Sequence, residues 1–320
     1  MPANVSKPTG KQSIIKRKQP QGFTLVEMIV VIVITGILGG MVAIFIKAPV
    51  QSYMDSALRA EMTDIADTAL RRVERDLRTA LPNSVRYTGA ACPGGAGTCD
   101  FLEYLPTTDG ARYRDAVDSA GAGDTLDFTS GVSADTTFDV LGTMPTVATG
   151  DQIVIYNLGI PGADAYSGNT AATDNRRAVA SVAGNNITIT STANFPFDSC
   201  IHDNIPSSPT FGNVVGGCRF QVVKTPVTYV CNQTAGTLTR YGGYAIQAAQ
   251  PTALATLQSA NSGTLLASHA SICHFTYDSS VVAQNYGLVT LRLTITEQNV
   301  NSGTNESVTL YSTMHVSNIP

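Results

Sequence analysis

The chain has 320 residues, a formal net charge of −4 and 14% charged residues. Five cations and no acid lie within residues 1–22, so removal of this leader would change the net charge to −9. A chain of this charge does not attract phosphate-rich polymers, and no nucleic-acid partner is expected.

An apolar run follows the basic leader. Residues 28–46 are apolar except for Thr35 and the glycines, and a membrane-spanning helix needs about 20 such residues. No convincing small-residue cleavage site follows the run, as it would in a secretory signal. We therefore expect a transmembrane helix over 23–48, with the leader (1–22) in the cytoplasm and the rest of the chain outside, by the positive-inside rule.

A short motif joins the leader to the apolar run. Gly22-Phe23-Thr24-Leu25-Val26-Glu27 places one carboxylate, Glu27, near the start of the helix. An ionised side chain in lipid is costly and is usually retained for a partner or a function. The alternative is a plain signal anchor with a tolerated interfacial acid, which leaves Gly22 unexplained.

This motif and its helix resemble the leader of type IV pilins and type II secretion pseudopilins. The resemblance implies cleavage after Gly22 by a prepilin peptidase and N-methylation of the new terminus, Phe23. It also implies that the carboxylate of Glu27 meets the N-terminal amine of a neighbouring subunit during assembly. The expected fold is α+β and pilin-like, with a long N-terminal helix packed on an antiparallel β-rich globular domain.

Residues 49–81 are expected to form the soluble half of this helix. Apolar residues recur at steps of three or four and form one stripe along it. The stripe consists of Met54, Leu58, Met62, Ile65, Ala69, Val73 and Leu77. Pro49 is expected to kink the helix and Pro82 to end it.

Residues 82–320 are rich in short β-type segments separated by Gly, Asn, Ser and Thr. They are expected to form one β-rich periplasmic or extracellular domain with an irregular insertion at about 89–150. Alternating apolar residues predict a C-terminal hairpin of 288–296 with 308–316. Further strands are expected at 151–158, 176–191 and 219–241, with Pro226 at an edge or bulge.

Six cysteines follow the membrane segment: Cys92, Cys99, Cys200, Cys218, Cys231 and Cys273. In an oxidising periplasm an even number indicates disulfides, although the sequence alone does not fix the pairing. The short flexible loop PGGAGT favours Cys92 with Cys99. Nearness along the chain favours Cys200 with Cys218 and Cys231 with Cys273. The four histidines are scattered and no Cys-x-x-Cys pair occurs, which argues against a zinc site.

The sequence contains no catalytic or nucleotide-binding motif such as G-x-S-x-G, H-E-x-x-H or Walker A. No enzymatic activity and no cofactor are expected. Calcium is the one ion considered, through loop carboxylates that lack EF-hand spacing and are by default solvated. These are Asp124, Asp127, Asp135 and Asp139.

Longer runs resemble one subgroup of the superfamily. "RFQVVKTPVTYVC", "GTLTRYGGYAI" and the C-terminal segment from "GLVTLRLTIT" onward are similar to the MshO subgroup of MSHA biogenesis proteins, and also to J-type pseudopilins. The resemblance implies a minor pilin or pseudopilin that primes or caps a type IV pilus or a type II secretion pseudopilus. Its implied partners are the prepilin peptidase, other pilins, an inner-membrane platform protein and membrane lipid. Its implied location is the bacterial inner membrane and then the fibre.

Two other function classes remain open. The large β domain exceeds what a simple fibre subunit needs, which favours a pilus-tip adhesin as the alternative. A membrane-anchored periplasmic enzyme is a third class.

Overall fold

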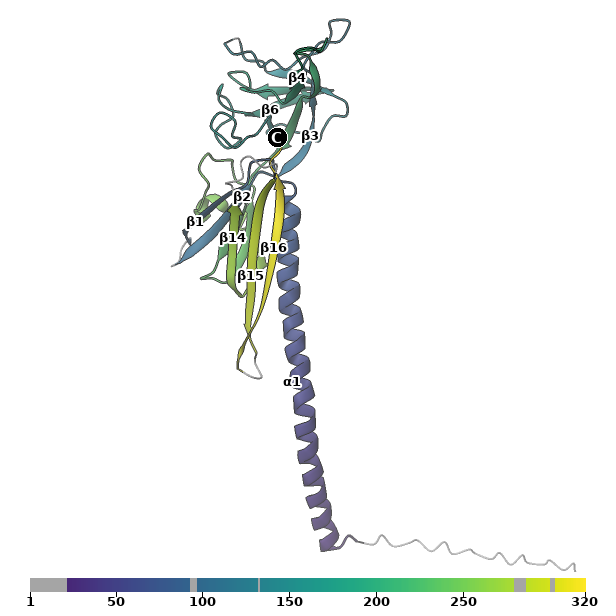
Figure 1. Ribbon diagram of the computed structural model, residues 1–320. Helices are drawn as coiled ribbons and strands as arrows, with labels where there is room; N and C mark the ends of the chain where they lie inside the picture. Colours follow the sequence, from purple (N-terminus) through teal and green to yellow (C-terminus); the bar gives the residue numbers. More distant parts are fainter. Residues whose placement is uncertain (1–21, 93–96, 132, 279–285, 300–302) are drawn as a thin grey trace, which may run out of the picture. The chain divides into compact units, whose positions relative to one another are not determined.

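The computed structural model (Figure 1) describes residues 22–92, 97–131, 133–278, 286–299 and 303–320. The chain divides into two compact units, Met1–Asp55 and Ser56–Pro320.

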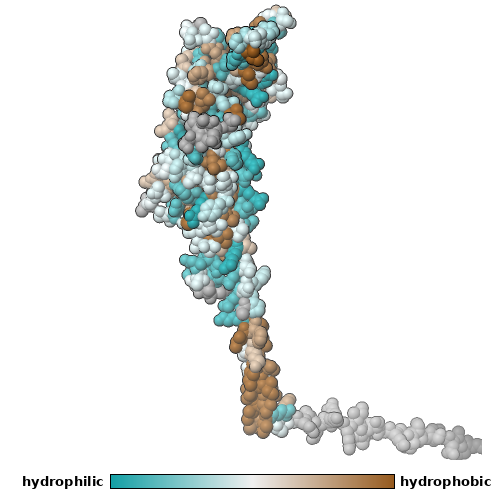
Figure 2. Space-filling model, viewed as in Figure 1, coloured by the Kyte–Doolittle hydropathy of each residue, from teal (hydrophilic) through white to brown (hydrophobic). Residues whose placement is uncertain are grey.

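One helix, α1 (Leu25–Leu77), contains Pro49 within its length and continues through it. In the first unit its large apolar side chains are exposed, and Figure 2 shows them as a continuous hydrophobic surface. By length and composition α1 is able to cross a membrane, with a mean hydropathy of 2.9 over its most apolar 18 residues. The helix ends five residues before Pro82, where the chain tightens into turns with Thr79 N–H donating to the Asp76 carbonyl and Ala80 N–H to that of Leu77.

The second unit contains a five-stranded and a three-stranded antiparallel sheet, besides a barrel and a two-stranded pair. The five-stranded sheet has the order β1 (Arg86–Ala91), β2 (Thr98–Tyr104), β11 (Val227–Asn232), β12 (Thr237–Gly242) and β13 (Thr264–Ala267). The three-stranded sheet has the order β14 (Ala270–Asp278), β15 (Tyr286–Gln298) and β16 (Asn305–Ser317). A short helix, α2 (Leu254–Leu257), lies between β12 and β13 in the chain.

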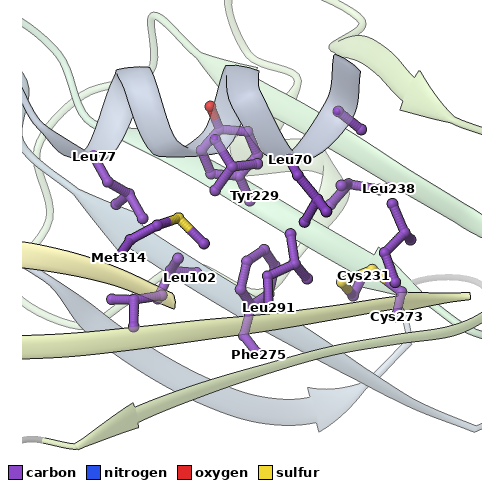
Figure 3. Packing of buried hydrophobic residues seen from close by; sticks show 14 of the residues in the cluster. Leu70, Leu77, Leu102, Tyr229, Cys231, Leu238, Cys273, Phe275, Leu291 and Met314 are labelled. Carbon is purple, nitrogen blue, oxygen red and sulfur yellow. A yellow bond between two sulfur atoms is a disulfide. The ribbon is translucent and has the colours of Figure 1, made fainter. Parts of the chain in front are cut away.

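The second half of α1 and both sheets share one hydrophobic core. Leu70 and Leu77 of the helix lie in the same buried cluster as Tyr229 of β11 and Phe275 and Leu291 of the three-stranded sheet (Figure 3). Burial of each such side chain contributes roughly 1.5–3 kcal/mol relative to exposure. This core is what fixes the soluble half of α1 to the β domain.

The predicted stripe on α1 largely faces this core. Met62, Ala69, Val73 and Leu77 are buried, whereas Met54 is exposed. Leu58 and Ile65 pack against the core while partly buried, and Ala66 and Leu70 join it on the neighbouring positions. A stripe with a period near 3.6 therefore gave the correct face of the helix.

Six strands form a closed barrel within the second unit. In barrel order they are β10 (Arg219–Val223), β3 (Thr107–Tyr113), β4 (Thr137–Leu141), β7 (Asn186–Thr190), β6 (Arg176–Ala183) and β5 (Gln152–Val154). A separate pair, β8 (Cys200–His202) with β9 (Val214–Gly217), precedes β10 in the chain. Phe138 and Phe220 meet edge to face in the barrel core.

The barrel is inserted between two neighbouring strands of the five-stranded sheet. β2 and β11 pair directly, with Tyr104 opposite Val227, although the whole barrel lies between them in the chain. The sheet is therefore complete without the barrel.

The α+β fold expected from the sequence is confirmed, and so is the C-terminal hairpin, in which β15 pairs with β16 from Tyr286 opposite Ser317 to Gln298 opposite Asn305. The hairpin expected around 176–191 is formed by β6 and β7. The segment 89–150 differs from the expected irregular insertion, because its first part forms β1 and β2 and its remainder opens the barrel.

The strands within 219–241 were expected to belong together, but they lie in two different sheets. β10 pairs with β3 and β5 in the barrel, whereas β11 and β12 pair in the five-stranded sheet. Pro226 lies where the chain passes from one to the other, a position that needs no ladder hydrogen bond.

Candidate functional site

The first turn of α1 carries the carboxylate of the sequence motif. Thr24 precedes the helix, and its Oγ1 accepts a hydrogen bond of 3.2 Å from the backbone N–H of Glu27. This bond is one half of a capping box, in which the N-cap threonine satisfies a backbone N–H that the helix end leaves free; the reciprocal bond from the Glu27 carboxylate is absent among the described residues. The helix therefore begins at this motif because the Thr24 hydroxyl satisfies a backbone N–H of its first turn.

This cap does not explain why residue 27 carries a carboxylate. It is exposed, and no hydrogen bond or ion pair of its carboxylate occurs with the described residues. A carboxylate in the first turn interacts favourably with the helix dipole, which is worth about 0.3–1 kcal/mol at an exposed site. This gain is smaller than the cost of about 2.5–3.5 kcal/mol for an ionised side chain at the centre of a bilayer, a cost that falls toward the interface.

The bond between Gly22 and Phe23 lies immediately before the helix. Both residues are exposed, Phe23 by 77%. Among the described residues, a Cβ added at Gly22 would meet no atom within 4 Å. Packing of the described residues thus gives no steric reason for glycine at this position.

The six cysteines form three disulfides, Cys92–Cys99, Cys200–Cys218 and Cys231–Cys273. These are the pairs that loop length and nearness along the chain favour. The first joins the ends of β1 and β2, the second joins β8 to the residue before β10, and the third links β11 to β14 and so the two sheets.

The four carboxylates expected as calcium candidates act as hydrogen-bond acceptors, and Asp139 lies on β4 rather than in a loop. Asp139 accepts from the backbone N–H of Asp124 at 3.1 Å, and the Asn186 amide donates to both carboxylates. Asp135 accepts from the backbone N–H of Asp127 at 2.8 Å. Within the described ranges no group of three or more His, Cys, Asp or Glu side chains is placed to hold a metal ion.

Sequence reasoning missed a cavity beside β10, lined in part by Arg219 and Gln221. The residues around it come from separate segments, so no local spacing marks them. Arg219 and Gln221 alternate with the buried Phe220 and Val222, which is the ordinary pattern of a half-exposed strand and marks no site in the sequence.

Comparison with known proteins identifies the N-terminal segment. Residues 17–43 match the family described as the prokaryotic N-terminal methylation motif, which supports a type IV pilin-like or pseudopilin-like structural subunit. The matched segment contains Gly22, Phe23 and Glu27 and the start of α1. No curated protein and no solved structure matches the chain.

Proposed function

We propose that the chain is a minor pilin or pseudopilin of the MshO type, which is cleaved after Gly22 and primes or caps assembly of a type IV pilus or type II secretion pseudopilus. The observation that carries this proposal is the exposed apolar half of α1, most of which lies within the segment that matches the methylation motif. In lipid and in a fibre, such a helix packs against the equivalent helices of other pilins. The prepilin peptidase and a platform protein are the further partners that this role requires.

Glu27 has a specific task in this proposal. Cleavage after Gly22 creates an amine at Phe23, four positions before Glu27, so the two groups lie near the same membrane depth in neighbouring subunits. A charge of opposite sign is the partner that a carboxylate in lipid requires. Pairing between subunits then neutralises both groups and aligns the two helices.

The test compares variants that separate charge from helix capping. Glu27→Gln keeps the size of the side chain and the cap formed by Thr24 but removes the charge. Thr24→Ala removes the observed cap and keeps the charge. Fractionation of sheared surface fibres against inner membrane should show that Glu27→Gln is cleaved and inserted but not assembled, whereas Thr24→Ala is assembled. Equal recovery of Glu27→Gln and wild type in the fibre fraction would contradict the assigned role.

A subunit at the very tip has only one of the two contacts, so its recovery in fibres is a weaker test. A crosslinking experiment detects the remaining contact directly. A lipid-soluble carbodiimide, which joins a carboxylate to an amine without any substitution, should link Glu27 of one subunit to the Phe23 amine of a neighbouring pilin. Absence of this link in assembled fibres would oppose the pairing.

A second candidate function is favoured by the barrel. Because β2 and β11 pair directly, the sheet needs no insertion between them, and an added domain of this size suits a binding module at the fibre tip. Joining Tyr104 to Val227 through a short turn removes the insertion. A tip adhesin predicts fibres that form normally but no longer attach to their target, and unchanged attachment would contradict it.

The choice between pilus and secretion system depends on other genes. Neighbouring reading frames for a pilus ATPase, a platform protein and further prepilins would decide which assembly includes the chain.

A further inference from the structure

A cavity of about 650 Å³ lies beside the outer face of β10, and none of its lining residues belongs to the N-terminal motif. Ligand pockets typically have volumes of roughly 300–1,000 Å³. The cavity is lined by Arg219 and Gln221 of β10, by the β8–β9 pair and residues near it, and by two C-terminal residues. The full set is Tyr156, Ser199, Cys200, Ile201, His202, Asn204, Gly217, Arg219, Gln221, Ile319 and Pro320.

Strand periodicity places two polar side chains together on the cavity side of β10. Phe220 and Val222 are buried in the barrel core, so the alternate residues Arg219 and Gln221 face outward. The guanidinium of Arg219 is exposed and forms no hydrogen bond or ion pair with the described part of the chain, and neither does the side-chain amide of Gln221. By contrast, Arg86 and Arg240 each pair with a carboxylate.

The wall of the cavity is held in place by local constraints. The disulfide Cys200–Cys218 joins β8 to the residue preceding Arg219. Ser199 Oγ accepts a 2.7 Å hydrogen bond from the backbone N–H of Arg219. Gly217, with φ of 77°, packs so closely that a Cβ there would lie 2.6 Å from the Ser199 carbonyl oxygen.

Tyr156 of the lining and Cys218, which precedes Arg219 in the chain, adopt a backbone conformation that residues other than glycine rarely adopt. Tyr156 has φ of 53° and Cys218 has φ of 54°. Such outliers cluster at functional sites. The cavity is therefore built before a ligand arrives, which lowers the entropic cost of binding.

The charges around the cavity define the ligand. His202 Nε2 lies 3.0 Å from Asp198 Oδ2, so this pair satisfies itself and leaves Arg219 as the unpaired cation of the lining. An arginine fork matches a carboxylate with two parallel hydrogen bonds. One unpaired cation suits a monoanion better than a phosphate dianion.

The remaining polar groups favour hydroxyls as neighbours of this carboxylate. The amides of Gln221 and Asn204 both donate and accept hydrogen bonds, as hydroxyl groups do. Tyr156 and Ile201 add an apolar surface that fits the C–H face of a ring. We infer that this cavity binds a uronic-acid unit of a polysaccharide, with its carboxylate on Arg219 and its hydroxyls on Gln221 and Asn204.

This inference deepens the second proposed function and is independent of the pilin role. The experiment uses the full chain in detergent micelles and measures binding of trigalacturonate by calorimetry, with the neutral galactose trisaccharide as the matched ligand. The acidic trisaccharide should bind saturably, and the neutral one about tenfold or more weakly, because the charge-assisted hydrogen bonds are lost.

Arg219→Gln should weaken trigalacturonate binding about tenfold or more. Arg75→Gln, which changes an exposed arginine of α1 outside the cavity, should leave it unchanged. Thermal melting of both variants should match wild type, since Arg219 forms no side-chain bond with the described residues.

Three results would overturn the inference: no saturable binding of trigalacturonate, equal binding by Arg219→Gln, or tighter binding of inorganic phosphate or of a short acidic peptide. Arg219→Gln should still enter fibres normally. A failure of the sugar experiment therefore leaves the assembly role untouched, and a failure to assemble leaves the cavity untouched.

Discussion

The phenolic hydroxyl of Tyr229 on β11 donates a 2.8 Å hydrogen bond to the carboxylate of Asp76 on α1. Arg240 Nε donates to the same oxygen at 2.8 Å, and Arg72 Nε lies 3.1 Å from the other oxygen. Tyr229 is fully buried. Asp76 therefore joins the polar edge of the helix to the sheet beside the apolar core.

Removal of this carboxylate should destabilise the domain. Asp76→Ala leaves the buried Tyr229 hydroxyl and the Arg240 guanidinium without their shared acceptor, which should cost about 2–3 kcal/mol. The matched control is Asp67→Ala, which removes an exposed pair with Arg71 and should cost less than about 1 kcal/mol. Chemical unfolding of the full chain measures both, and equal midpoints for the two variants would contradict the assignment.

The same carboxylate predicts a pH dependence. Burial raises the pKa of Asp76, but hydrogen bonds from Tyr229 and Arg240 and the charges of Arg240 and Arg72 outweigh it, so the pKa lies below the ordinary value of 3.8. The stabilisation is complete above pH 3.8 and is lost as the pH falls through the lower folded-state pKa. The stability difference between wild type and Asp76→Asn should be constant above pH 3.8 and shrink below it. A difference that grows on acidification would contradict this linkage.

The disulfides should contribute unequally to stability. Replacing Cys231 and Cys273 by alanine opens a 42-residue separation and disconnects the two sheets, at a cost of about 2–4 kcal/mol. Replacing Cys92 and Cys99 opens a separation of only 7 residues and should cost less. Thiol counting on denatured, unreduced wild type should find no free cysteine. Six free thiols would refute the disulfide account.

The helix and the C-terminal hairpin could be predicted because apolar residues recur at a regular spacing along each of them. The five-stranded sheet was harder to predict, because buried polar residues interrupt the apolar pattern of its strands. Asp100 and Glu103 interrupt β2 in the sequence, yet both are buried. Asp100 accepts from Tyr87 and Phe275, and Glu103 pairs with Arg86. Burial raises the pKa of Glu103, an effect that Arg86 and Tyr244 partly offset. Without knowledge of these partners, the sequence alone suggests that such a charged residue lies in a loop.

Neither the barrel nor its cavity could be predicted in this way. Closure depends on β10 pairing with β3 and β5, which lie far away in the chain. The fully buried Arg177 of β6 donates to five backbone carbonyls and to Ser191, a network that no spacing indicates. The cavity likewise combines Tyr156, Arg219 and Ile319 from three separate segments. The N-terminal motif, by contrast, is one contiguous stretch and could be predicted directly from the sequence.

Substitution at the cleavage position should block processing without disturbing the fold. Gly22→Leu adds a side chain into open space, so insertion and folding should match wild type while the uncleaved precursor accumulates in the inner membrane. Gly40→Ala, at a second glycine with open space around it, should be cleaved normally. Immunoblotting of membrane fractions separates precursor from mature chain, and normal cleavage of Gly22→Leu would count against this site.

The central claim is that the chain is a prepilin-type subunit whose apolar helix is kept after processing. N-terminal sequencing combined with intact-mass analysis of the protein from its native membrane tests it most directly. We predict a mature chain that begins at Phe23, carries one added methyl group on its amine and retains α1. A chain that still begins at Met1, or one that lacks the apolar helix, would contradict the claim.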